Sequence, residues 1–426
     1  MKKLLTIGTL IAMSMGTLIG CSNESANPTD NTTEGNEVDS SETREPVDLK
    51  LWLDEEDYAE PLLEALAVAL PHINITWEEV GTVDTLEKLL LDGPAGLGAD
   101  IILIPHDHMA DGVNQNAFVP LGSELSEMME GRIPNDALGT VSHNDTYYGV
   151  PLATESVALF YNKTLLDELE LEVATTFEEI LEQAEKFNNP RDNEFILLFE
   201  GGNPYHGHIF LTSYGYELFG PNHDDADLIS LDSSEVVQGL EFLEKVSEIL
   251  PVPSGDLDWD TTHGRFVDGE APYMISGPWS ISDMHEYADF EWGITTIPTI
   301  NGTQPQTFAG YTIAIISSYT DEADAAREVL DFMASDEGIQ IIYEGRGSIP
   351  ALVDSTIIPG VSEDPYSLGV LAQAEHAHPM PLIPEMSSYW AAAGPMFEAV
   401  WDGLLTPEEA AAKAEADFYA SLHMQQ

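Results

Sequence analysis

The chain has 426 residues, of which 14 are basic and 76 acidic, so its formal net charge at pH 7 is −62. An acidic surface of this kind repels phosphate backbones and anionic lipid headgroups, which argues against a nucleic-acid-binding protein. A hydrophobic content of 43% with 33 glycines is typical of a folded protein with a sizeable core, either two domains or one large bilobal domain.

The first twenty residues form a separate segment. Met1-Lys2-Lys3 is positively charged, and the apolar stretch after it is too short and too interrupted by Gly and Ser to favour a membrane-spanning helix. It ends in Leu-Ile-Gly before Cys21, the only cysteine of the chain. This pattern resembles the lipobox of bacterial lipoproteins and predicts a signal peptide over residues 1–20 with lipidation of Cys21. An ordinary signal peptide followed by an incidental cysteine is the alternative.

Residues 21–47 are polar and acidic and contain no periodic pattern of apolar residues. Such a composition predicts a disordered acidic tether between the lipid anchor and the folded part of the chain. The protein is therefore expected to be exported and held by its lipid anchor on the extracellular face of the cytoplasmic membrane.

Short β-rich runs alternate with amphipathic helical segments beyond the tether. The sequence predicts strands at 49–53, 73–80 and 99–105, separated by helices at 59–72 and 85–93. This βαβαβ order indicates a mainly parallel sheet with helices on both faces. Open α/β sheets bind ligands beyond the carboxyl ends of their strands, so the segments just after strands are the places to look for a site.

The later elements are predicted from capping boxes and from periodicity. They are helices that start after Thr176 (with Glu179) and Thr406 (with Glu409), helices at 236–250 and 321–335, and a strand at 311–317 that follows a turn at Gly310.

Polar side chains follow the third strand in the segment PHDHM, residues 105–109. His106, Asp107 and His108 are of metal-ligating types, but adjacent side chains on an extended chain point to opposite sides and no spaced Cys or His pattern accompanies them. No metal site is predicted there. An ionised Asp107 accepts two hydroxyl hydrogen bonds, which suits a polyol ligand; alternatively it caps the following helix.

One acid and several aromatic side chains also stand out. Glu155 lies between two apolar runs and is either a buried structural group or a ligand acceptor. Tyr205, Trp279, Tyr389 and Trp390 lie in segments rich in Gly, Pro and Ser, where a ring has few apolar neighbours and can present a face to a ligand. Such rings together with a few carboxylates favour a carbohydrate site, because sugar faces stack on rings and hydroxyl groups bind to acids.

An enzyme is the less favoured interpretation. A glycosidase needs two carboxylates flanking one bond, and 76 acidic residues leave room for such a pair, but no motif isolates one. The chain has no GxSxG, P-loop or dinucleotide-binding motif. The sequence therefore favours a binding protein and predicts no cofactor. A surface glycoside hydrolase and a structural adhesin are the alternatives from other classes.

Several stretches, in this order, resemble the bacterial maltose- and maltodextrin-binding proteins, the extracellular solute-binding proteins (family 1) of ABC sugar importers. They are LKLWL, ADIILIPHDHMADG, YYGVPLATESVALFYNKTLL, TFEEI, NPYH, APYMISGPW, FAGYTIAII, ASDEG and MPLIPEMSSYW, and they span nearly all of residues 48–426.

The resemblance implies an α/β fold of the periplasmic-binding-protein type, with two lobes that each hold a mainly parallel sheet flanked by helices. The N-terminal lobe would comprise residues 48–153 and 312–360, and the C-terminal lobe residues 154–311 and 361–426. The ligand would bind in the cleft between the lobes. The implied partners are a maltodextrin-type oligosaccharide and the transmembrane subunits of an ABC permease, and the protein is expected to be a monomer.

By matching position, the resemblance also implies roles for nine side chains. Asp107 and Glu155 would accept hydrogen bonds from sugar hydroxyl groups, and Trp279 and Trp390 would stack on sugar rings. Tyr205 would be the aromatic residue of the PY loop, and Glu56 would be the acid after the first strand. The residues that would line the cleft are Met380, Pro204 and Tyr389.

The sequence departs from the family pattern at several of these places. Ile104 and His206 stand where the family has an aromatic residue, and Asn203 stands where it has an acid. Asp57 replaces a Lys of the family, and His108 and Gly394 each replace an Arg. Aromatic and cationic side chains of the family pattern are thereby lost. Cyclodextrin, a galacto-oligosaccharide or another neutral oligosaccharide therefore stays open as the ligand.

Overall fold

The computed structural model describes residues 46–425, which fall in one compact unit. The predicted signal peptide, the predicted lipidation site at Cys21 and the predicted tether up to residue 45 lie outside the described residues. Strand β1 begins at Val47, so regular structure starts one residue before the predicted lobe boundary at residue 48. Within the described part of the chain, no helix is both long enough and apolar enough to cross a membrane.

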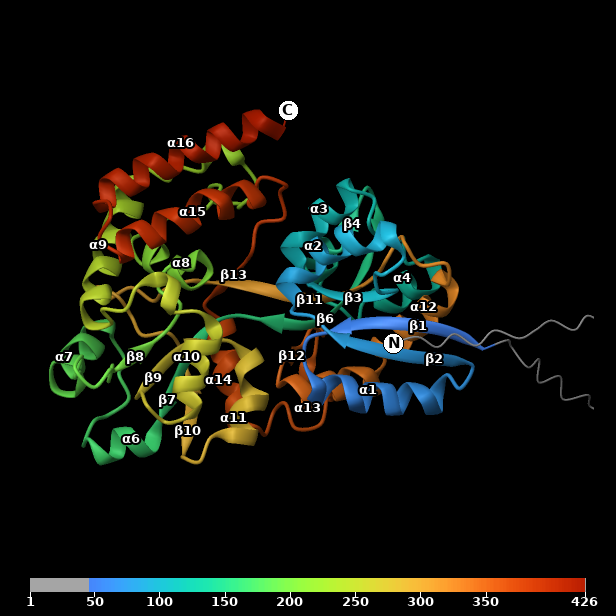
Figure 1. The fold of residues 1–426 in the computed structure, drawn as a ribbon, viewed down its shortest axis with the longest axis horizontal. Helices are drawn as coiled ribbons and strands as arrows, with labels where there is room; N and C mark the ends of the chain where they lie inside the picture. The colour runs from blue at the N-terminus through green and yellow to red at the C-terminus, as the bar shows by residue number, and fades with distance from the viewer. Residues whose placement is uncertain (1–45, 426) are drawn as a thin grey trace, which may run out of the picture. The chain divides into compact units, whose positions relative to one another are not determined.

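The larger sheet has seven strands in the order β12-β6-β11-β3-β1-β2, with β13 paired to β11 (Figure 1). They are β1 (Val47–Leu53), β2 (Ile73–Glu79), β3 (Ile101–Pro105), β6 (Gly149–Glu155), β11 (Thr307–Ile316), β12 (Ile349–Pro350) and β13 (Ala377–Pro379). Strands β2, β1 and β3 run parallel, as the βαβαβ order predicts. Strand β11 runs antiparallel to both β3 and β6.

The smaller sheet has four strands in the order β10-β7-β9-β8. They are β7 (Ala158–Asn162), β8 (Leu197–Leu198), β9 (Tyr273–Ser276) and β10 (Trp292–Thr295). Strand β7 is antiparallel to both of its neighbours, whereas β8 and β9 are parallel. Strands β4 (Ser142–His143) and β5 (Thr146–Tyr147) form a separate hairpin.

Both sheets are mixed, which corrects the expectation of mainly parallel sheets, while the two-lobed α/β class is confirmed by the solved structures described below. The reason lies in how the chain passes between the sheets. Strand β7 follows β6 after only two residues and enters the smaller sheet directly. The chain later returns to the larger sheet through β11, which runs antiparallel to β3 and β6, the strands that precede it in the chain.

Helices surround both sheets. Beside the larger sheet are α1 (Glu56–Ala69), α2 (Thr82–Asp92), α3 (Met109–Asn114), α4 (Ser123–Met129), α5 (Asn135–Thr140), α12 (Ala323–Met333) and α13 (Asp336–Arg346). The others are α6 (Lys163–Glu168), α7 (Phe177–Phe187), α8 (Pro204–Thr212), α9 (Ser234–Ile249), α10 (Trp259–Val267), α11 (Ile281–Tyr287), α14 (Pro365–Ala374), α15 (Met386–Trp401) and α16 (Pro407–Gln425). Helix α13 packs along α1, and α15 packs along α16 (Figure 1).

Local sequence signals locate most of these elements. Thr176 accepts the backbone N–H of Glu179 at 3.1 Å, and the Glu179 carboxylate accepts in return, so the predicted capping box is confirmed. The box between Thr406 and Glu409 is also present. Gly310, however, is not a turn. It lies inside β11, where it forms the last pair with β6, opposite Glu155, and the strand continues beyond it by pairing with β13.

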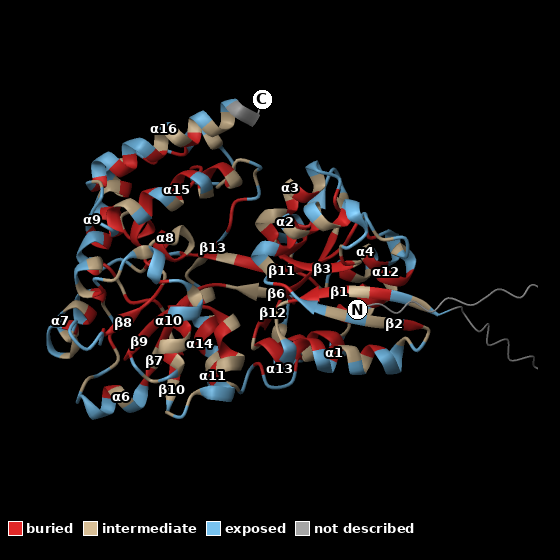
Figure 2. Ribbon diagram, viewed as in Figure 1, coloured by how far each residue is buried: buried red, intermediate tan, exposed pale blue. Residues whose placement is uncertain are grey.

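The described residues form two hydrophobic cores. One surrounds the larger sheet and the other the smaller sheet. Figure 2 shows strands of both sheets buried, while the outer faces of α1 and α16 are exposed. Two separate cores are what two lobes require, although the boundaries of the lobes stay a prediction.

Most described cations are already paired with acids. The ion-paired ones are Lys88, Arg132, Lys163, Arg265, Arg327, Arg346 and Lys413. The large excess of carboxylates therefore faces other carboxylates and solvent, and mutual repulsion destabilises the compact state.

We expect the Tm to rise with NaCl between about 0.01 M and 0.15 M, because the screening length shortens from about 30 Å to about 8 Å. Differential scanning calorimetry measures the shift. An equivalent amount of sucrose controls for solute exclusion from the surface. A Tm that stays flat or falls across this range contradicts the expectation.

Candidate functional site

Asp107 lies directly after β3, in a single 3-10 turn, η2 (His106–His108), rather than on extended backbone. Its Oδ2 accepts a hydrogen bond from Nε1 of Trp390, at 2.9 Å. No side chain caps α3, so the capping role considered for Asp107 is not the one it has. His106 is buried, and its Nδ1 accepts the backbone N–H of Tyr311 at 3.0 Å. The turn thus directs the carboxylate toward an aromatic ring and the first imidazole into the core.

Glu155 is the last residue of β6, and its side chain is 16% exposed. Its Oε1 accepts a hydrogen bond from the Thr312 hydroxyl and lies 3.5 Å from Nη2 of Arg346. Its Oε2 makes no hydrogen bond with any residue in the described range. Burial raises the pKa of Glu155, while Arg346 and Thr312 oppose that rise. Glu155 is therefore anchored by one oxygen only, which combines the two roles that the sequence left open.

Tyr205 is held in place by the start of α8. Asn203 caps the helix by accepting the backbone N–H of Tyr205 at 2.9 Å, and Pro204 occupies the first helical position, for which its fixed φ is suited. Burial raises the pKa of the Tyr205 hydroxyl, and the charges of Glu155 and Asp107 raise it further. The hydroxyl group therefore stays protonated, and it lies within the field of both carboxylates.

Trp279 lies on a stiff turn, η5 (Pro278–Ser280), after β9. Its ring folds back over Gly277, where a Cβ would lie only 2.2 Å from the ring. The hydroxyl groups of Ser276 and Ser280, 2.7 Å apart, brace the same turn. The ring is half-buried, and its centroid is 6.3 Å from that of Tyr205.

Phe308 on β11 completes the arrangement and was not predicted from the sequence. Its ring stacks with Tyr205 at 5.9 Å and meets Trp390 edge-on at 5.7 Å. Trp279, Tyr205, Phe308 and Trp390 thus form one continuous series of rings, here called the aromatic row. Asp107 contacts the row at Trp390, and Glu155 lies near it at Tyr205. Phe308 is the first residue of the stretch FAGYTIAII, which resembles the family, but no role was predicted for its side chain.

Two buried histidines lie behind Phe308. The His208 ring stacks on Phe308 at 3.8 Å, and its Nε2 is 2.9 Å from Nε2 of His378. Burial lowers the pKa of His378 to about 4 and that of His208 well below the usual value. Both imidazoles are therefore neutral at pH 7, and they support the aromatic row as packing groups.

Two residues expected to line the cleft are core residues instead. Tyr389 is 0% exposed and packs against Phe219, because successive helical residues point about 100° apart and Trp390 takes the other direction. Met380 is 4% exposed, and its backbone N–H donates to the Ala309 carbonyl at 3.1 Å. Neither side chain presents a surface to a ligand in this structure, which corrects their predicted placement.

The acid predicted after the first strand is also displaced by one position. Glu56 is exposed in the first turn of α1 and has no contact with the aromatic row. The acids that point inward are Asp54 and Glu55, just before the helix, and both reach Arg346. Helix α1 begins at Glu56, three residues earlier than predicted, so its first turn directs Glu56 outward.

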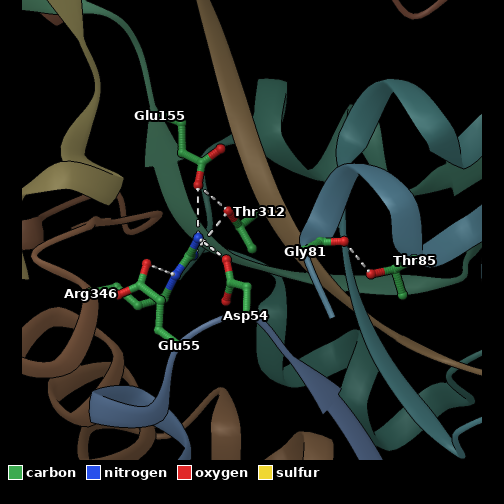
Figure 3. Close-up of polar contacts among 7 residues, drawn as sticks. All are labelled: Asp54, Glu55, Gly81, Thr85, Glu155, Thr312 and Arg346. Atoms are coloured by element: carbon green, nitrogen blue, oxygen red, sulfur yellow. Dashed lines mark hydrogen bonds and ion pairs between the residues drawn. The ribbon is translucent and has the colours of Figure 1, made fainter. Parts of the chain in front are cut away.

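Arg346 gathers these acids into one cluster, shown in Figure 3. It is the last residue of α13 and is 1% exposed. The contacts of its guanidinium, here called the Arg346 cluster, are Nη2 to Asp54 at 2.7 Å, Nε to Glu55 at 3.4 Å, Nη1 to Thr312 at 3.3 Å and Nη2 to Glu155 at 3.5 Å. Burial raises the pKa of Glu55 to about 8, against the opposing effect of Arg346. At neutral pH the cluster therefore keeps a proton on Glu55.

A cavity of about 220 Å³ opens beside Asp107. Its walls come from residues 106–114, 139–143 and 381–384, and they combine apolar side chains with Asp107 and two histidines. Asp107 therefore lies between the aromatic row and an open space.

Residues 63–366 match the family model described as bacterial extracellular solute-binding protein, which covers well over half of the chain. The chain belongs to this family. The family consists of solute-binding proteins, not enzymes, and its extracellular character agrees with the predicted export.

Known relatives and solved structures match most of this solute-binding protein. The Galactooligosaccharide-binding protein of Bacillus subtilis is 26% identical over 76% of this chain and 77% of its own length. The Maltooligosaccharide ABC transporter solute-binding lipoprotein of Streptococcus pneumoniae (strain ATCC BAA-255 / R6) is 26% identical over 94% of this chain and 92% of its own. The crystal structure of a cyclo/maltodextrin-binding protein complexed with maltotetraose superimposes on this structure with a TM-score of 0.70. The two sequences are 28% identical, and the match covers 92% of this chain and 99% of that chain.

Gly277→Ala is expected to displace the Trp279 ring, because the added Cβ meets the ring at 2.2 Å. Near-ultraviolet circular dichroism should lose part of its tryptophan signal, and a urea melt should show a loss of about 1–3 kcal/mol from overpacking. Gly255→Ala is the control, since nothing lies within 4 Å of a Cβ there. Spectra of the two variants that match each other and wild type contradict the prediction.

Glu55→Gln is expected to stabilise this solute-binding protein increasingly as the pH rises from about 4.5 to about 8. The folded state holds the Glu55 proton up to about pH 8, whereas the unfolded chain releases it near 4.5, so wild-type stability falls across this window. The gain of the variant should then level off at a few kcal/mol, because each unit of pKa shift is worth about 1.4 kcal/mol.

Urea melts at several pH values measure the difference between Glu55→Gln and wild type. Glu60→Gln, which changes an exposed residue of helix α1, serves as the control and should show no such trend. A constant difference between Glu55→Gln and wild type over the whole window refutes the assignment.

Proposed function

We propose that this protein is a lipid-anchored receptor that captures maltodextrin-type oligosaccharides and delivers them to the permease of an ABC sugar importer. The observation that carries the proposal is the aromatic row next to Asp107 and Glu155. Aromatic faces stack on the C–H-rich faces of sugars, and carboxylates accept hydrogen bonds from their hydroxyl groups. The names of the Streptococcus relative and of the maltotetraose complex support this ligand class.

Each side chain has a distinct role in the proposal. Trp279 and Trp390 are the stacking platforms, and Tyr205 stands between them with its hydroxyl group toward the carboxylates. Asp107 and Glu155 accept hydrogen bonds from sugar hydroxyl groups. Behind them Pro204 fixes the start of α8, and Met380 and Tyr389 support the row from the core.

Anchoring follows from Cys21, and the relative named a lipoprotein supports it. The protein acts as a monomer, and its two lobes close on the sugar. One lobe comprises residues 48–153 and 312–360, and the other residues 154–311 and 361–426. The transmembrane subunits of the permease then receive the sugar. No bond of the sugar is cleaved, so a labelled dextrin should be recovered intact after incubation.

A receptor for galacto-oligosaccharides is the second candidate. It is favoured by the name of the Bacillus subtilis relative. It is also favoured by the departures from the maltodextrin pattern, such as Asn203, which here caps α8 instead of offering an acid.

Isothermal titration of the mature chain separates the two candidates. Maltotriose, maltotetraose, β-cyclodextrin and a galacto-oligosaccharide are titrated in turn, with a thermal melt for each, because a ligand of the folded state raises the Tm. We expect the maltodextrins to bind more tightly than the galacto-oligosaccharide. The reverse order selects the second candidate, and the absence of binding by every sugar contradicts both.

Trp279→Ala should weaken maltotriose binding by roughly thirty-fold or more, because truncation of a buried aromatic anchor often costs about 2 kcal/mol or more. Trp279→Phe should recover part of the loss, since it keeps a flat face of smaller area. Calorimetric titration measures the affinity, and a urea melt measures stability.

The matched control is Trp77→Ala, which removes a half-buried tryptophan from β2, at the edge of the larger sheet. It should leave the affinity unchanged. If Trp279→Ala lowers stability by about 3–5 kcal/mol while the folded fraction binds as wild type does, Trp279 is a core residue and its proposed role is wrong.

A further inference from the structure

The two oxygens of Glu155 have different surroundings. Thr312 and Arg346 both contact Oε1, while Oε2 makes no hydrogen bond with any described residue. In Figure 3 the second oxygen points away from the guanidinium. Gly310, paired with Glu155 across the strands, leaves open the space in which a Cβ would lie 3.8 Å from the Tyr205 hydroxyl oxygen. The Tyr205 hydroxyl group, a member of the aromatic row, thus lies beside the strand pair that carries Glu155, and Oε2 is the carboxylate oxygen that no described residue occupies.

We propose that Arg346 is a positioning residue of the sugar site: its guanidinium holds Glu155 by Oε1 so that an ionised Oε2 faces the ligand, and Glu55 competes with Glu155 for the same guanidinium. The inference rests on the proposed function. Arg346 does not touch the sugar in this proposal. It acts through Glu155.

The first reason is the charge state of Glu155. A carboxylate removed from water is ionised at neutral pH only when a cation or hydrogen bonds compensate the lost solvation. Burial already raises the pKa of Glu155 in the presence of Arg346. Without the guanidinium the pKa of Glu155 would rise further, and a protonated carboxyl group loses part of its capacity to accept hydrogen bonds from sugar hydroxyl groups.

The second reason is the number of acids around one cation. Asp54 makes the shortest contact, at 2.7 Å, and Glu55 and Glu155 lie at 3.4 Å and 3.5 Å. The charged and titratable groups that face the cluster are Asp54 and Glu55 before α1, Tyr58 on α1, Tyr205 on α8 and Asp283 on α11. When Glu55 ionises, three carboxylates share a single positive charge, and the hold on Glu155 weakens.

The third reason is the place of Arg346 in the fold. Helix α13 ends at Arg346, and Gly347 follows in a left-handed conformation with φ of +64°. A Cβ on Gly347 would lie 2.6 Å from the side chain of Ile281, the first residue of α11. The end of α13 also contacts η5, the turn that carries Trp279. Helix α13, which ends at Arg346, therefore contacts both Glu155, through the guanidinium, and the turn that carries a stacking ring.

Calorimetric titration of maltotriose at about pH 6, 7.5 and 9 tests the proposal. Maltotriose has no titratable group in this range, so any pH dependence comes from the protein. The variants are Arg346→Met, Glu155→Gln and the double variant, all in the Glu55→Gln background, which removes the competing titration. We expect Arg346→Met to weaken binding about tenfold or more near pH 7.5, and this loss should become smaller as the pH rises, because the variant raises the pKa of Glu155 and a higher pH favours the ionised carboxylate.

The double variant distinguishes positioning from general support of the fold. If Arg346 acts through Glu155, Arg346→Met should add little loss once Glu155 is Gln. Arg132→Met, which removes the Arg paired with Asp336 at the opposite end of α13, is the control and should leave affinity and pH profile unchanged. Urea melts accompany every titration.

Removing a buried cation from several acids can prevent folding. In that case Arg346→Lys, which keeps the charge but lacks the forked guanidinium, is used in the same cycle and should show a smaller loss with the same dependence on Glu155. A flat pH profile, or an equal loss whether residue 155 is Glu or Gln, overturns the inference. If wild type fails to bind maltotriose, the proposed ligand is wrong, and the same cycle is run with the sugar that the panel identifies.

Discussion

The antiparallel pairing of β6 with β11 is the constraint on which the site depends. In this register Gly310 lies opposite Glu155, and Thr312, two residues further along β11, falls on the same face. The Thr312 hydroxyl therefore reaches the carboxylate, and the missing side chain of Gly310 leaves room beside Tyr205. A shift by one residue would turn Thr312 to the opposite face and separate it from Glu155. Strand β11 also carries Phe308, which pairs with His378 of β13, so the same strand holds both the partner of the acid and the centre of the aromatic row.

Local patterns in the sequence are enough to predict most elements and part of the site. The βαβαβ order, the capping box at Thr176 and the position of Asp107 after a strand each depend on a few neighbouring residues, and each is found in the structure. Arg346 could not be found in this way. Its partners lie as many as 292 positions away along the chain, and an Arg at the end of an amphipathic helix is typical of a solvated surface. Only the tertiary fold brings it to Glu155.

Two of the misplaced residues, Tyr389 and Glu56, are adjacent to a residue that does reach the site. Tyr389 and Trp390 are neighbours on α15, yet one enters the core and the other contacts Asp107. Glu55 has an extended backbone before α1 and points to Arg346, whereas Glu56, the first residue of the helix, is exposed. Helical neighbours point about 100° apart, so a segment can be predicted correctly while the side chain that reaches the site is not.

The Arg346 cluster is a weak source of stability, which makes its presence informative. The desolvation of two buried charges often offsets their attraction, and a well-packed apolar replacement is frequently as stable or more so. The chain has few cations to distribute, 14 against 76 acidic residues. One of them is nevertheless enclosed with three carboxyl groups at the end of the strand that leads from one core to the other. A role in holding an ionised oxygen toward the cleft accounts for this placement, whereas a gain in stability does not.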